Sequence, residues 1–346
     1  MTTLTEQVKA LALEQGFVRA GVAAVTPLDP DAQHFREWLA AGHHGSMSYL
    51  EETAEVRTDI AHPKLLPSAR SVIALATSYA RADTSSTALA PGKVARYARG
   101  RDYHPLLYDR TRAIKRLLRE QGHTARACVD TMPALERAWA ARAGLGFIGK
   151  NACLIVPGVG SHVLLTLIAT SAELVPDAAM EERCGQCRLC LDACPTRAFV
   201  AERKLDARRC IAYLTIEHEG SIDPELRASM GSWIFGCDAC QDVCPWNRTR
   251  PVPEEQTRPF APRLRSAELG AEDLLRMDDA VFERYSRGMP MRRAGREGMA
   301  RNAAIVLGNS GDKRYLPLLD ERAKNDSSAV VRDAARWASD ELDKKR

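Results

Sequence analysis

The sequence predicts three consecutive parts: an α/β domain over residues 1–175, a small cysteine-rich domain over 176–255 and an α-helical region over 256–346. Three observations predict this division. Strand-like and helix-like segments alternate in the first half, which is typical of a sheet covered by helices. Two closely spaced cysteine runs follow, and a short helical motif recurs near the C-terminus.

The N-terminal part is predicted from its hydrophobic periodicity. Segments with apolar residues three or four positions apart are expected to be helices, and short β-rich apolar runs are expected to be strands. Pro133 can open a helix that Gly144 ends. In chain order we expect helix Thr3–Gln15, strand Ser71–Tyr79, helix Leu106–Gln121, strand Ala125–Asp130, helix Pro133–Ala143 and strand Val163–Thr170.

The first cysteine run has the spacing of bacterial ferredoxins. It reads Cys184-Gly-Gln-Cys187-Arg-Leu-Cys190-Leu-Asp-Ala-Cys194-Pro195, or C-x2-C-x2-C-x3-C-P. In that pattern three neighbouring thiolates bind one 4Fe–4S cluster and the fourth binds another cluster. The run therefore predicts a ferredoxin-like domain with two 4Fe–4S clusters.

A second run and one isolated cysteine complete two sets of four ligands. The second run repeats the later part of the spacing and also ends in Cys–Pro, while Cys210 stands alone between the runs. Gly185 and Gly236 allow close backbone approach. We assign Cys184, Cys187, Cys190 and Cys244 to the first cluster, and Cys194, Cys210, Cys237 and Cys240 to the second.

Zinc and disulfides are the alternatives to iron–sulfur clusters. Zinc knuckles use C-x2-C pairs, usually without a third cysteine and a Cys–Pro ending. A disulfide scaffold is typical of short secreted chains. Two cysteines are left over, Cys128 and Cys153, and we expect both to be small buried hydrophobes, as free cysteines usually are.

Length and composition are those of an ordinary globular chain. The 346 residues carry a net charge of +4, and 45% of them are hydrophobic. No run of about eighteen apolar residues is present, and Met1–Gly16 lacks the apolar centre of a signal peptide. We therefore expect a cytoplasmic protein with no membrane partner.

The C-terminal part is predicted to be helical after a linker. Arg250–Arg263 contains four prolines among charged residues, which favours a linker. Arg301-Asn302-Ala303-Ala304 recurs 31 residues later as Arg332-Asp333-Ala334-Ala335. A repeat of that length is typical of HEAT-like helical pairs.

Asp130 is the first candidate for chemistry in the α/β part. It lies between a predicted strand and a predicted helix, a usual active-site position in α/β folds. The alternative is a helix-capping aspartate, worth about 1 kcal/mol of stability. Gly144–Asn151 is a glycine-rich loop with a lysine that lacks P-loop spacing; it could hold a phosphate or a cofactor edge, or be a tight turn.

Four segments in this order closely resemble the epoxyqueuosine reductase family: VDTMPALERAWAARAGLGFIGKN, CGQCRLCLDACPTRA, RCIAYLTIEH and FGCDACQDVCPWN. The resemblance runs over nearly the whole chain, including ARYARGRDYH before these segments and the helical tail after them. One departure is Phe147, where the family pattern has tryptophan, and it puts only local cofactor packing in doubt.

The resemblance implies reduction of epoxyqueuosine to queuosine at the wobble base of tRNA, the last step of queuosine biosynthesis. It also implies cobalamin beside the two clusters. The D-x-H-x-x-G signature of many base-off cobalamin proteins begins at Asp102 but is broken at Leu107, which agrees with a base-off cofactor that has no histidine ligand. The cofactor-binding residues implied are Arg57, Tyr97, Asp130, Lys150, Asn151 and Ser161.

The resemblance further makes Asp130 the proton donor to the epoxide oxygen. An acid beside a poor leaving group lowers the barrier to its departure. To be protonated near neutral pH the carboxyl needs a raised pKa, which an apolar pocket could provide.

The partners expected are tRNA carrying epoxyqueuosine and an external electron donor, bound by a monomer. Residues 281–301 hold six arginines and two acids, a density that can neutralise tRNA phosphates or form a solvated helix face. The tRNA-binding residues expected are Arg292, Arg293, Arg296 and Arg301.

Two other functions are considered. A reductive dehalogenase would not need the basic tail, and exported dehalogenases carry a twin-arginine signal that this chain lacks. An electron carrier would not need the large N-terminal part.

Overall fold

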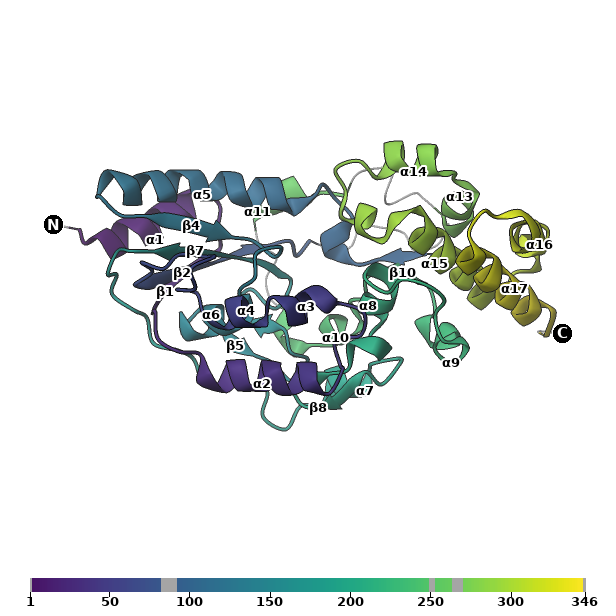
Figure 1. The fold of residues 1–346 in the computed structure, drawn as a ribbon, viewed down its shortest axis with the longest axis horizontal. Coiled ribbons are helices and arrows are strands. Elements are labelled where there is room, and N and C mark those ends of the chain that lie inside the picture. The colour runs from purple at the N-terminus through teal and green to yellow at the C-terminus, as the bar shows by residue number, and fades with distance from the viewer. Residues whose placement is uncertain (1, 82–91, 249–252, 263–269, 345–346) are drawn as a thin grey trace.

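The computed structural model describes residues 2–81, 92–248, 253–262 and 270–344. The N- and C-termini lie at opposite ends of the molecule (Figure 1). A sheet covered by helices forms the N-terminal end, the cysteine-rich part lies in the middle, and a helical region forms the C-terminal end (Figure 1). No helix among the described residues is long and apolar enough to cross a membrane.

One four-stranded sheet organises the N-terminal part. Its order is β1 (Arg19–Ala24), β2 (Ser71–Ser78), β7 (Val163–Thr170), β4 (Ala125–Cys128). The expected layers of helix and sheet are present, but every neighbouring pair in this sheet is antiparallel. Because β2 and β4 both run opposite to β7, their carboxyl ends meet at one edge, where β7 begins.

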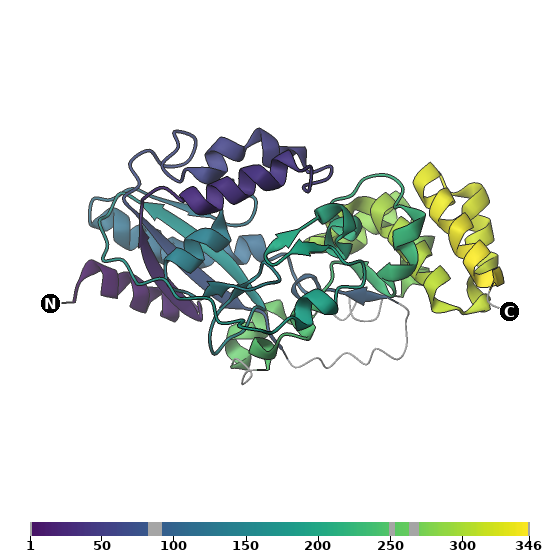
Figure 2. The same ribbon diagram turned by 90° about the horizontal axis from the view of Figure 1, so that it is seen from below.

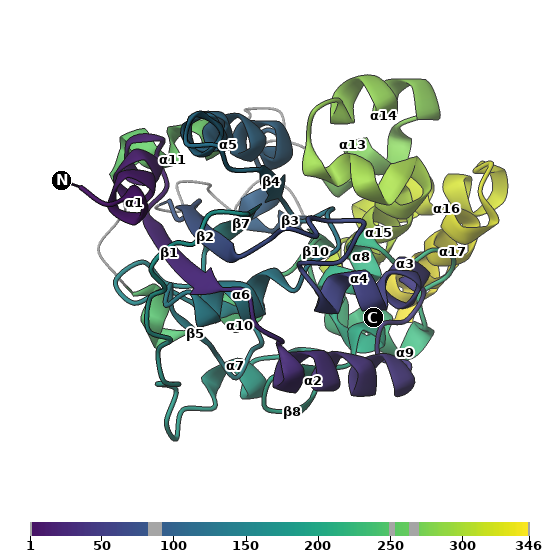
Figure 3. The ribbon, with the colours of Figure 1, turned by 60° about the vertical axis from the view of Figure 1, so that its left-hand side comes forward.

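Different helices cover the two faces of the sheet (Figure 3). Alternate residues of a strand point to opposite faces. Ile73 and Leu75 pack with α1 and α5, whereas Val72 and Ala74 pack with α4 and α6. The bounds are α1 (Leu4–Glu14), α2 (Asp29–Ala40), α3 (Ser48–Glu52), α4 (Ala54–Thr58), α5 (Tyr103–Glu120) and α6 (Glu136–Arg142).

Sequence periodicity predicted most of these elements. Thr3 caps α1, since its hydroxyl accepts the Glu6 N–H and the Glu6 carboxylate accepts the Thr3 N–H. The predicted helices and strands coincide with α1, β2, α5, β4 and β7 to within a few residues. Helix α6 begins at Glu136 rather than Pro133, because residues 130–134 form a turn first.

The cysteine-rich part consists of short elements. It also pairs with the first half of the chain, because β3 (Lys93–Val94) lies parallel to β10 (Trp233–Phe235). The other short elements are η1 (Arg96–Ala98), β5 (Phe147–Ile148), β6 (Leu154–Ile155), α7 (Leu189–Asp192), β8 (Phe199–Ala201), β9 (Lys204–Leu205), η2 (Ala207–Arg209), α8 (Ile211–Ile216), α9 (Pro224–Arg227), η3 (Ala228–Met230), α10 (Ala239–Asp242) and η4 (Pro245–Asn247).

The predicted linker Arg250–Arg263 is wrong where the structure describes it. Residues 253–262 form α11 (Glu254–Thr257) and η5 (Arg258–Phe260). Phe260 is buried in the core between the sheet and α5, and Arg110 lies over its ring. The prolines therefore break the segment into short turns that pack on the N-terminal part; residues 250–252 and 263 lie outside the described residues.

The described C-terminal residues are mostly helical, as predicted. Helices α15 and α17 pack so closely that a Cβ added at Gly308 would lie 2.7 Å from Ala338. This region shares one hydrophobic core with α8 and β10 of the cysteine-rich part. The two regions lie side by side in Figure 2. Its elements are α13 (Ala271–Arg276), α14 (Asp279–Ser286), η6 (Pro290–Ala294), α15 (Gly295–Ser310), η7 (Lys313–Tyr315), α16 (Leu316–Asn325) and α17 (Ala329–Lys344).

Candidate active site

The edge of the sheet where β2 and β4 end gathers polar and aromatic side chains. The Tyr79 N–H donates to the His162 carbonyl at 3.1 Å, and the two rings meet edge to face at 5.5 Å. Asp130 follows β4 by two residues at the same edge. The antiparallel pairing therefore brings the ends of separate strands to one place.

Asp130 is held by contacts from α5 and α6. Its Oδ2 accepts a hydrogen bond from the Tyr103 hydroxyl at 2.8 Å and lies 3.3 Å from His104 Nε2. Its backbone has a φ of 46°, and its N–H donates to Glu136 Oε1 at 2.8 Å. Left-handed backbone at a non-glycine residue is strained and concentrates at functional sites. The carboxylate is thus presented outward from a turn that Glu136 secures.

The capping role considered for Asp130 is wrong. The residue at the N-cap of α6 is Leu135, and no side chain caps that helix. The Asp130 carboxylate instead faces the first turn of α5, and 59% of its side chain is exposed to solvent.

Charges around Asp130 set three pKa values. The contact with His104, followed by the Tyr103 hydrogen bond, lowers the pKa of Asp130. The hydrogen bond with Asp102, then the 3.3 Å contact with the Asp130 carboxylate, raises the pKa of His104 to about 9. Burial, then the charge of Asp130, raises the pKa of Glu136 to about 8. The prediction that the Asp130 carboxyl has a raised pKa is therefore wrong, because a protonated imidazole stands beside it.

Sequence reasoning missed His104 and Glu136 as members of this site. The signal for His104 was its spacing from Asp102, since an aspartate two residues earlier can orient an imidazole. Asp102 Oδ1 lies 2.7 Å from His104 Nδ1 and also accepts the His104 backbone N–H, as the N-cap of α5. No sequence signal distinguished Glu136 from an ordinary first-turn acid.

Aromatic rings connect this site to the second cysteine run. Tyr97 lies with its ring centroid 6.1 Å from that of Tyr103 and 6.4 Å from that of Phe235. Gly236 follows, with a φ of 66°, and a Cβ there would lie 2.6 Å from Ala95. The second run therefore begins directly behind the aromatic wall of the Asp130 site.

The structure brings together the four cysteines assigned to the first cluster. They line one cavity with Lys150, Asn151 and Trp246. Burial, then the contact with Glu182 and the charge of Cys190, raises the pKa of the Cys184 thiol to about 11. Trp246 meets Phe147 edge to face, with ring centroids 5.4 Å apart. Phe147, the position that departs from the family pattern, therefore packs against a residue that lines this cavity. The cavity is lined by Cys184, Cys187, Cys190 and Cys244.

The other four cysteines form a second group. Burial, then the charges of Cys210 and Cys194 among others, raises the pKa of Cys237 to about 12. The hydrogen bond with Cys153 and burial raise the pKa of Cys240, and the charges of Cys210 and Cys237 contribute to the same shift. This group therefore contains Cys194, Cys210, Cys237 and Cys240.

The two remaining cysteines differ from each other. Cys128 is fully buried, as expected, and burial raises its pKa to about 12. Cys153 is not an isolated hydrophobe, because a hydrogen bond with Cys240 lowers its pKa. The β5–β6 turn places it beside the second cysteine group.

The six residues expected to bind cofactor fall into two places. Arg57 donates to Thr53 Oγ1 at 2.9 Å and stands near Asp130, as Tyr97 does. Lys150 donates to the Gly185 carbonyl at 2.7 Å beside the first cysteine group.

Asn151 and Ser161 also lie on the cysteine side. Asn151 Oδ1 accepts the Cys153 N–H, while its buried Nδ2 has no hydrogen-bond partner among the described residues. The Ser161 N–H donates to Asn247 Oδ1 at 2.6 Å, and the Asn247 side chain donates to its hydroxyl.

Two of the four arginines expected to bind tRNA are buried. Arg301 is 2% exposed and donates to the carbonyls of Leu214, His218 and Gly220. Arg296 is 9% exposed and pairs with Asp326 through both nitrogens. The prediction that these two contact tRNA is wrong, because their guanidinium groups are engaged inside the fold.

The other two arginines are exposed. Arg292 pairs with Glu283 at 2.6 Å. Arg293 pairs with Glu217 and lies over the ring of Tyr49, with its Cζ 5.9 Å from the centroid. Arg57 lies over the same ring at 5.8 Å. The positive charge of Arg293 also contributes to the lowered pKa of Asp130, so this arginine stands at the mouth of the site.

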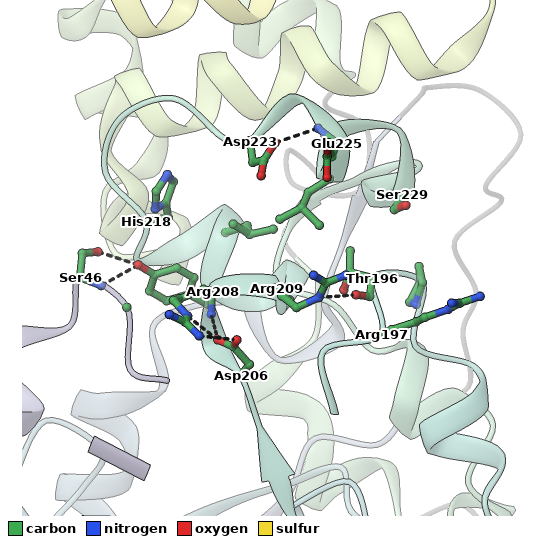
Figure 4. Close-up of a pocket in the computed structure, with 15 residues that line it drawn as sticks. Ser46, Thr196, Arg197, Asp206, Arg208, Arg209, His218, Asp223, Glu225 and Ser229 are labelled. Carbon is green, nitrogen blue, oxygen red and sulfur yellow. Dashed lines mark hydrogen bonds and ion pairs between the residues drawn. The ribbon is translucent and has the colours of Figure 1, made fainter. Parts of the chain in front are cut away.

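A larger cavity of about 850 Å³ is lined by residues of η2, α8 and α9 (Figure 4). Arg208 pairs with Asp206 in it, and Arg209 donates to the Thr196 carbonyl. The Tyr213 hydroxyl accepts the Ser46 N–H at its rim. The polar groups of this cavity thus largely satisfy one another.

Comparison with protein families identifies two regions. Residues 183–247 match the model described as a 4Fe–4S double cluster binding domain. Residues 57–131 match the model described as epoxyqueuosine reductase QueG, DUF1730. The first match agrees with the two cysteine groups, and the part of the chain that carries them is a double 4Fe–4S cluster domain.

Similarity to epoxyqueuosine reductases extends over almost the entire chain. The Xanthomonas campestris enzyme is 40% identical over 97% of this chain and 96% of its own length. The Pseudomonas aeruginosa enzyme is 41% identical over 97% of this chain and 93% of its own length.

Solved structures show the same fold. A crystal structure of epoxyqueuosine reductase with an epoxyqueuosine-modified tRNA-Tyr stem loop has a TM-score of 0.91, with 29% identity over 98% of this chain and 90% of that one. The Bacillus subtilis enzyme, with its aspartate-bearing catalytic loop swung out of the active site, has a TM-score of 0.89, with 29% identity over 98% of this chain and 90% of that one. The chain therefore belongs to the epoxyqueuosine reductase family and is an oxidoreductase.

Proposed function

We propose that this chain reduces the epoxide of epoxyqueuosine in tRNA to the alkene of queuosine, the last step of queuosine biosynthesis, with Asp130 as proton donor. The observation that carries the proposal is the position of Asp130. Its exposed carboxylate stands at the sheet edge that faces the cysteine-rich part, inside a network of Tyr103, His104 and Glu136. The related enzyme with an aspartate-bearing catalytic loop supports this role.

We further propose that the two cysteine groups hold the two clusters in the sets assigned from the sequence. The cavity of the first group and the mutual charges of the second support this division. The second run begins close to the active site, because Phe235 contacts the Tyr97 ring, which in turn contacts Tyr103. Electrons from an external donor then arrive one at a time.

Cobalamin fits the residues present between these two regions. Asn151 offers an unpartnered buried amide nitrogen, and the Arg57 guanidinium offers donors suited to the amide and phosphate groups of such a cofactor. When bound, it would supply a strongly reducing cobalt centre. Arg57, Tyr97, Asp130, Lys150, Asn151 and Ser161 are the residues proposed to hold it.

We propose that tRNA binds across the mouth of the site through exposed arginines. Arg292 and Arg293 are exposed on η6, and Arg293 reaches both Glu217 and Tyr49. The related structure with a modified stem loop supports a tRNA substrate. Arginine–phosphate contacts position a nucleic acid without reading its sequence.

The proposed division of labour follows the three predicted parts. Residues 1–175 supply the acid and the cofactor contacts, 176–255 the clusters, and 256–346 the HEAT-like tRNA-binding surface. The Asp130 network is made within one chain, which fits a monomer.

The test is turnover by protein reconstituted anaerobically with iron, sulfide and cobalamin. About eight irons per chain and conversion of an epoxyqueuosine stem loop to the product lacking one oxygen are expected, measured by mass spectrometry. Fully loaded protein that leaves the epoxide intact when supplied with a strong reductant would refute the assignment.

A further inference from the structure

The proposed reaction needs two protons, but Asp130 can carry only one. Reducing an epoxide to an alkene breaks both carbon–oxygen bonds, consumes two electrons and two protons, and releases the oxygen as water. The electrons come from the external one-electron donor through the iron–sulfur clusters. One proton is needed as the ring opens, and the second as the resulting hydroxyl leaves. The acid must therefore be recharged within a turnover.

The neighbours of Asp130 form a line that ends at the surface. Asp130 Oδ2 lies 3.3 Å from His104 Nε2, and His104 Nδ1 lies 2.7 Å from Asp102 Oδ1. Exposed side-chain fractions are 25% for His104 and 37% for Asp102, so solvent reaches the far end of the line. The imidazole also stacks on the Tyr103 ring, with centroids 4.3 Å apart, which fixes its plane.

We propose that His104 supplies the second proton of the reaction by protonating Asp130 between the two transfers, while Asp102 orients the imidazole and returns its proton from solvent. This inference rests on the proposed function, because it assumes that Asp130 protonates the substrate oxygen. His104 acts through Asp130 and does not itself contact the substrate. A proton thus passes from solvent through Asp102, His104 and Asp130 in turn to the substrate.

Two other neighbours are less suited to this task. Burial, then the charge of Asp130, raises the pKa of Tyr103 far above its ordinary value, so its hydroxyl keeps its proton and serves as a hydrogen-bond donor. Glu136 Oε1 contacts the backbone N–H of Asp130 and secures the turn. His104 alone of the three is a cation at neutral pH that touches the Asp130 carboxylate.

The charged groups that face this line keep the resting proton on His104, because contact with His104 lowers the pKa of both Asp102 and Asp130. Asp102 and Asp130 raise the pKa of His104, which keeps the imidazole protonated up to about pH 9. Arg293 lowers the pKa of Asp130, and the buried Glu136 carboxyl is close enough for the charge of Asp130 to raise its pKa. The resting state is therefore an imidazolium beside a carboxylate, and one proton moves between them.

The test is single-turnover reduction by pre-reduced, fully loaded enzyme across a pH series. Wild-type protein should slow as pH rises through about 9, where His104 loses its proton. The single-turnover rate of His104→Gln should be roughly tenfold to a hundredfold lower at pH 7. It should also lack this alkaline limb, the fall in rate near pH 9. Asp102→Asn removes the largest cause of the raised pKa, so the limb should move down by about one pH unit or more.

Controls separate this relay from a structural role. His34→Gln changes an exposed histidine on α2 and should match wild type in rate and pH profile. Iron content, cobalamin content and stem-loop affinity of each variant should be unchanged. If His104→Gln does not fold, the limb shift of Asp102→Asn decides the question alone.

Two failures can be distinguished. The relay would be overturned if the His104 and Asp102 variants both kept the wild-type rate and pH dependence while Asp130→Asn was inactive. Asp130 would then remain the proton donor. Full activity of Asp130→Asn would overturn the proposed donor itself.

Discussion

Arg301→Met tests the assignment of this arginine to the interior rather than to tRNA. The guanidinium lies 2.7, 2.8 and 2.7 Å from the carbonyls of Leu214, His218 and Gly220. Each carbonyl left without a partner costs about 1 kcal/mol or more. Burial lowers the pKa of Arg301 to about 10, so removing the charge recovers part of a desolvation cost.

The expected net loss is about 2–3 kcal/mol in the free energy of unfolding, because methionine fills the apolar space but leaves the three carbonyls and Asn302 Oδ1, which Arg301 also contacts, without this donor. Denaturant midpoints of anaerobic, cluster-loaded protein measure it. Arg292→Met is the matched control, since its ion pair with Glu283 is exposed and should contribute about 1 kcal/mol or less.

Stem-loop affinity at several salt concentrations completes the test. Arg301→Met should retain the wild-type dependence of stem-loop affinity on salt. Arg292→Met should lower the slope of log affinity against log salt concentration by about one, the value expected for one lost phosphate contact. A stable Arg301→Met protein that binds tRNA weakly, with a reduced slope, would refute the structural assignment and restore the expectation from the sequence.

The other predictions concern the proposed acid Asp130, the iron–sulfur clusters and the exposed arginines of η6. Asp130→Asn should retain both clusters and cobalamin but reduce epoxide turnover by roughly two to four orders of magnitude, measured with a cofactor count on the same sample; near wild-type turnover would exclude Asp130. Cys210→Ala should lose about four of eight irons, and retention of all eight would contradict the ligand sets. Paired Arg292→Glu and Arg293→Glu should weaken stem-loop binding most at low salt, and an unchanged affinity across the salt series would remove η6 from the binding surface.

Local patterns predicted the elements whose signals are local. The capping box at Thr3 and the regular apolar spacing of Leu106–Gln121 specify helices without help from the rest of the chain. The strand β1 has the sequence RAGVAA, whose alanines carry little β-preference, so only pairing with β2 makes it a strand.

The cysteine sets were predictable because ligand spacing reflects cluster geometry. The environment of Asp130 was not, since it depends on residues that the sheet brings together from α5 and α6. An apolar pocket and a neighbouring imidazolium shift a carboxyl pKa in opposite directions. The sequence alone could not decide between them.

The repeated motif does not predict which of its arginines is buried. Arg301 and Arg332 occupy equivalent positions of the repeat, yet Arg301 joins α15 to the chain around α8, and Arg332 donates to the Asp326 and Ser327 carbonyls just before its own helix. Charge density along the sequence counts both kinds of arginine alike. Only packing separates those that hold the fold from those free to meet a phosphate.

Arg293 links substrate binding to acid strength. It pairs with Glu217, lies over Tyr49 and lowers the pKa of Asp130 by its positive charge. A phosphate that binds Arg293 neutralises this charge and competes with Glu217, so the pKa of Asp130 rises when the anion is bound. If tRNA binds Arg293 as proposed, protonation of Asp130 by the neighbouring imidazolium would be easier in the loaded site than in the empty one.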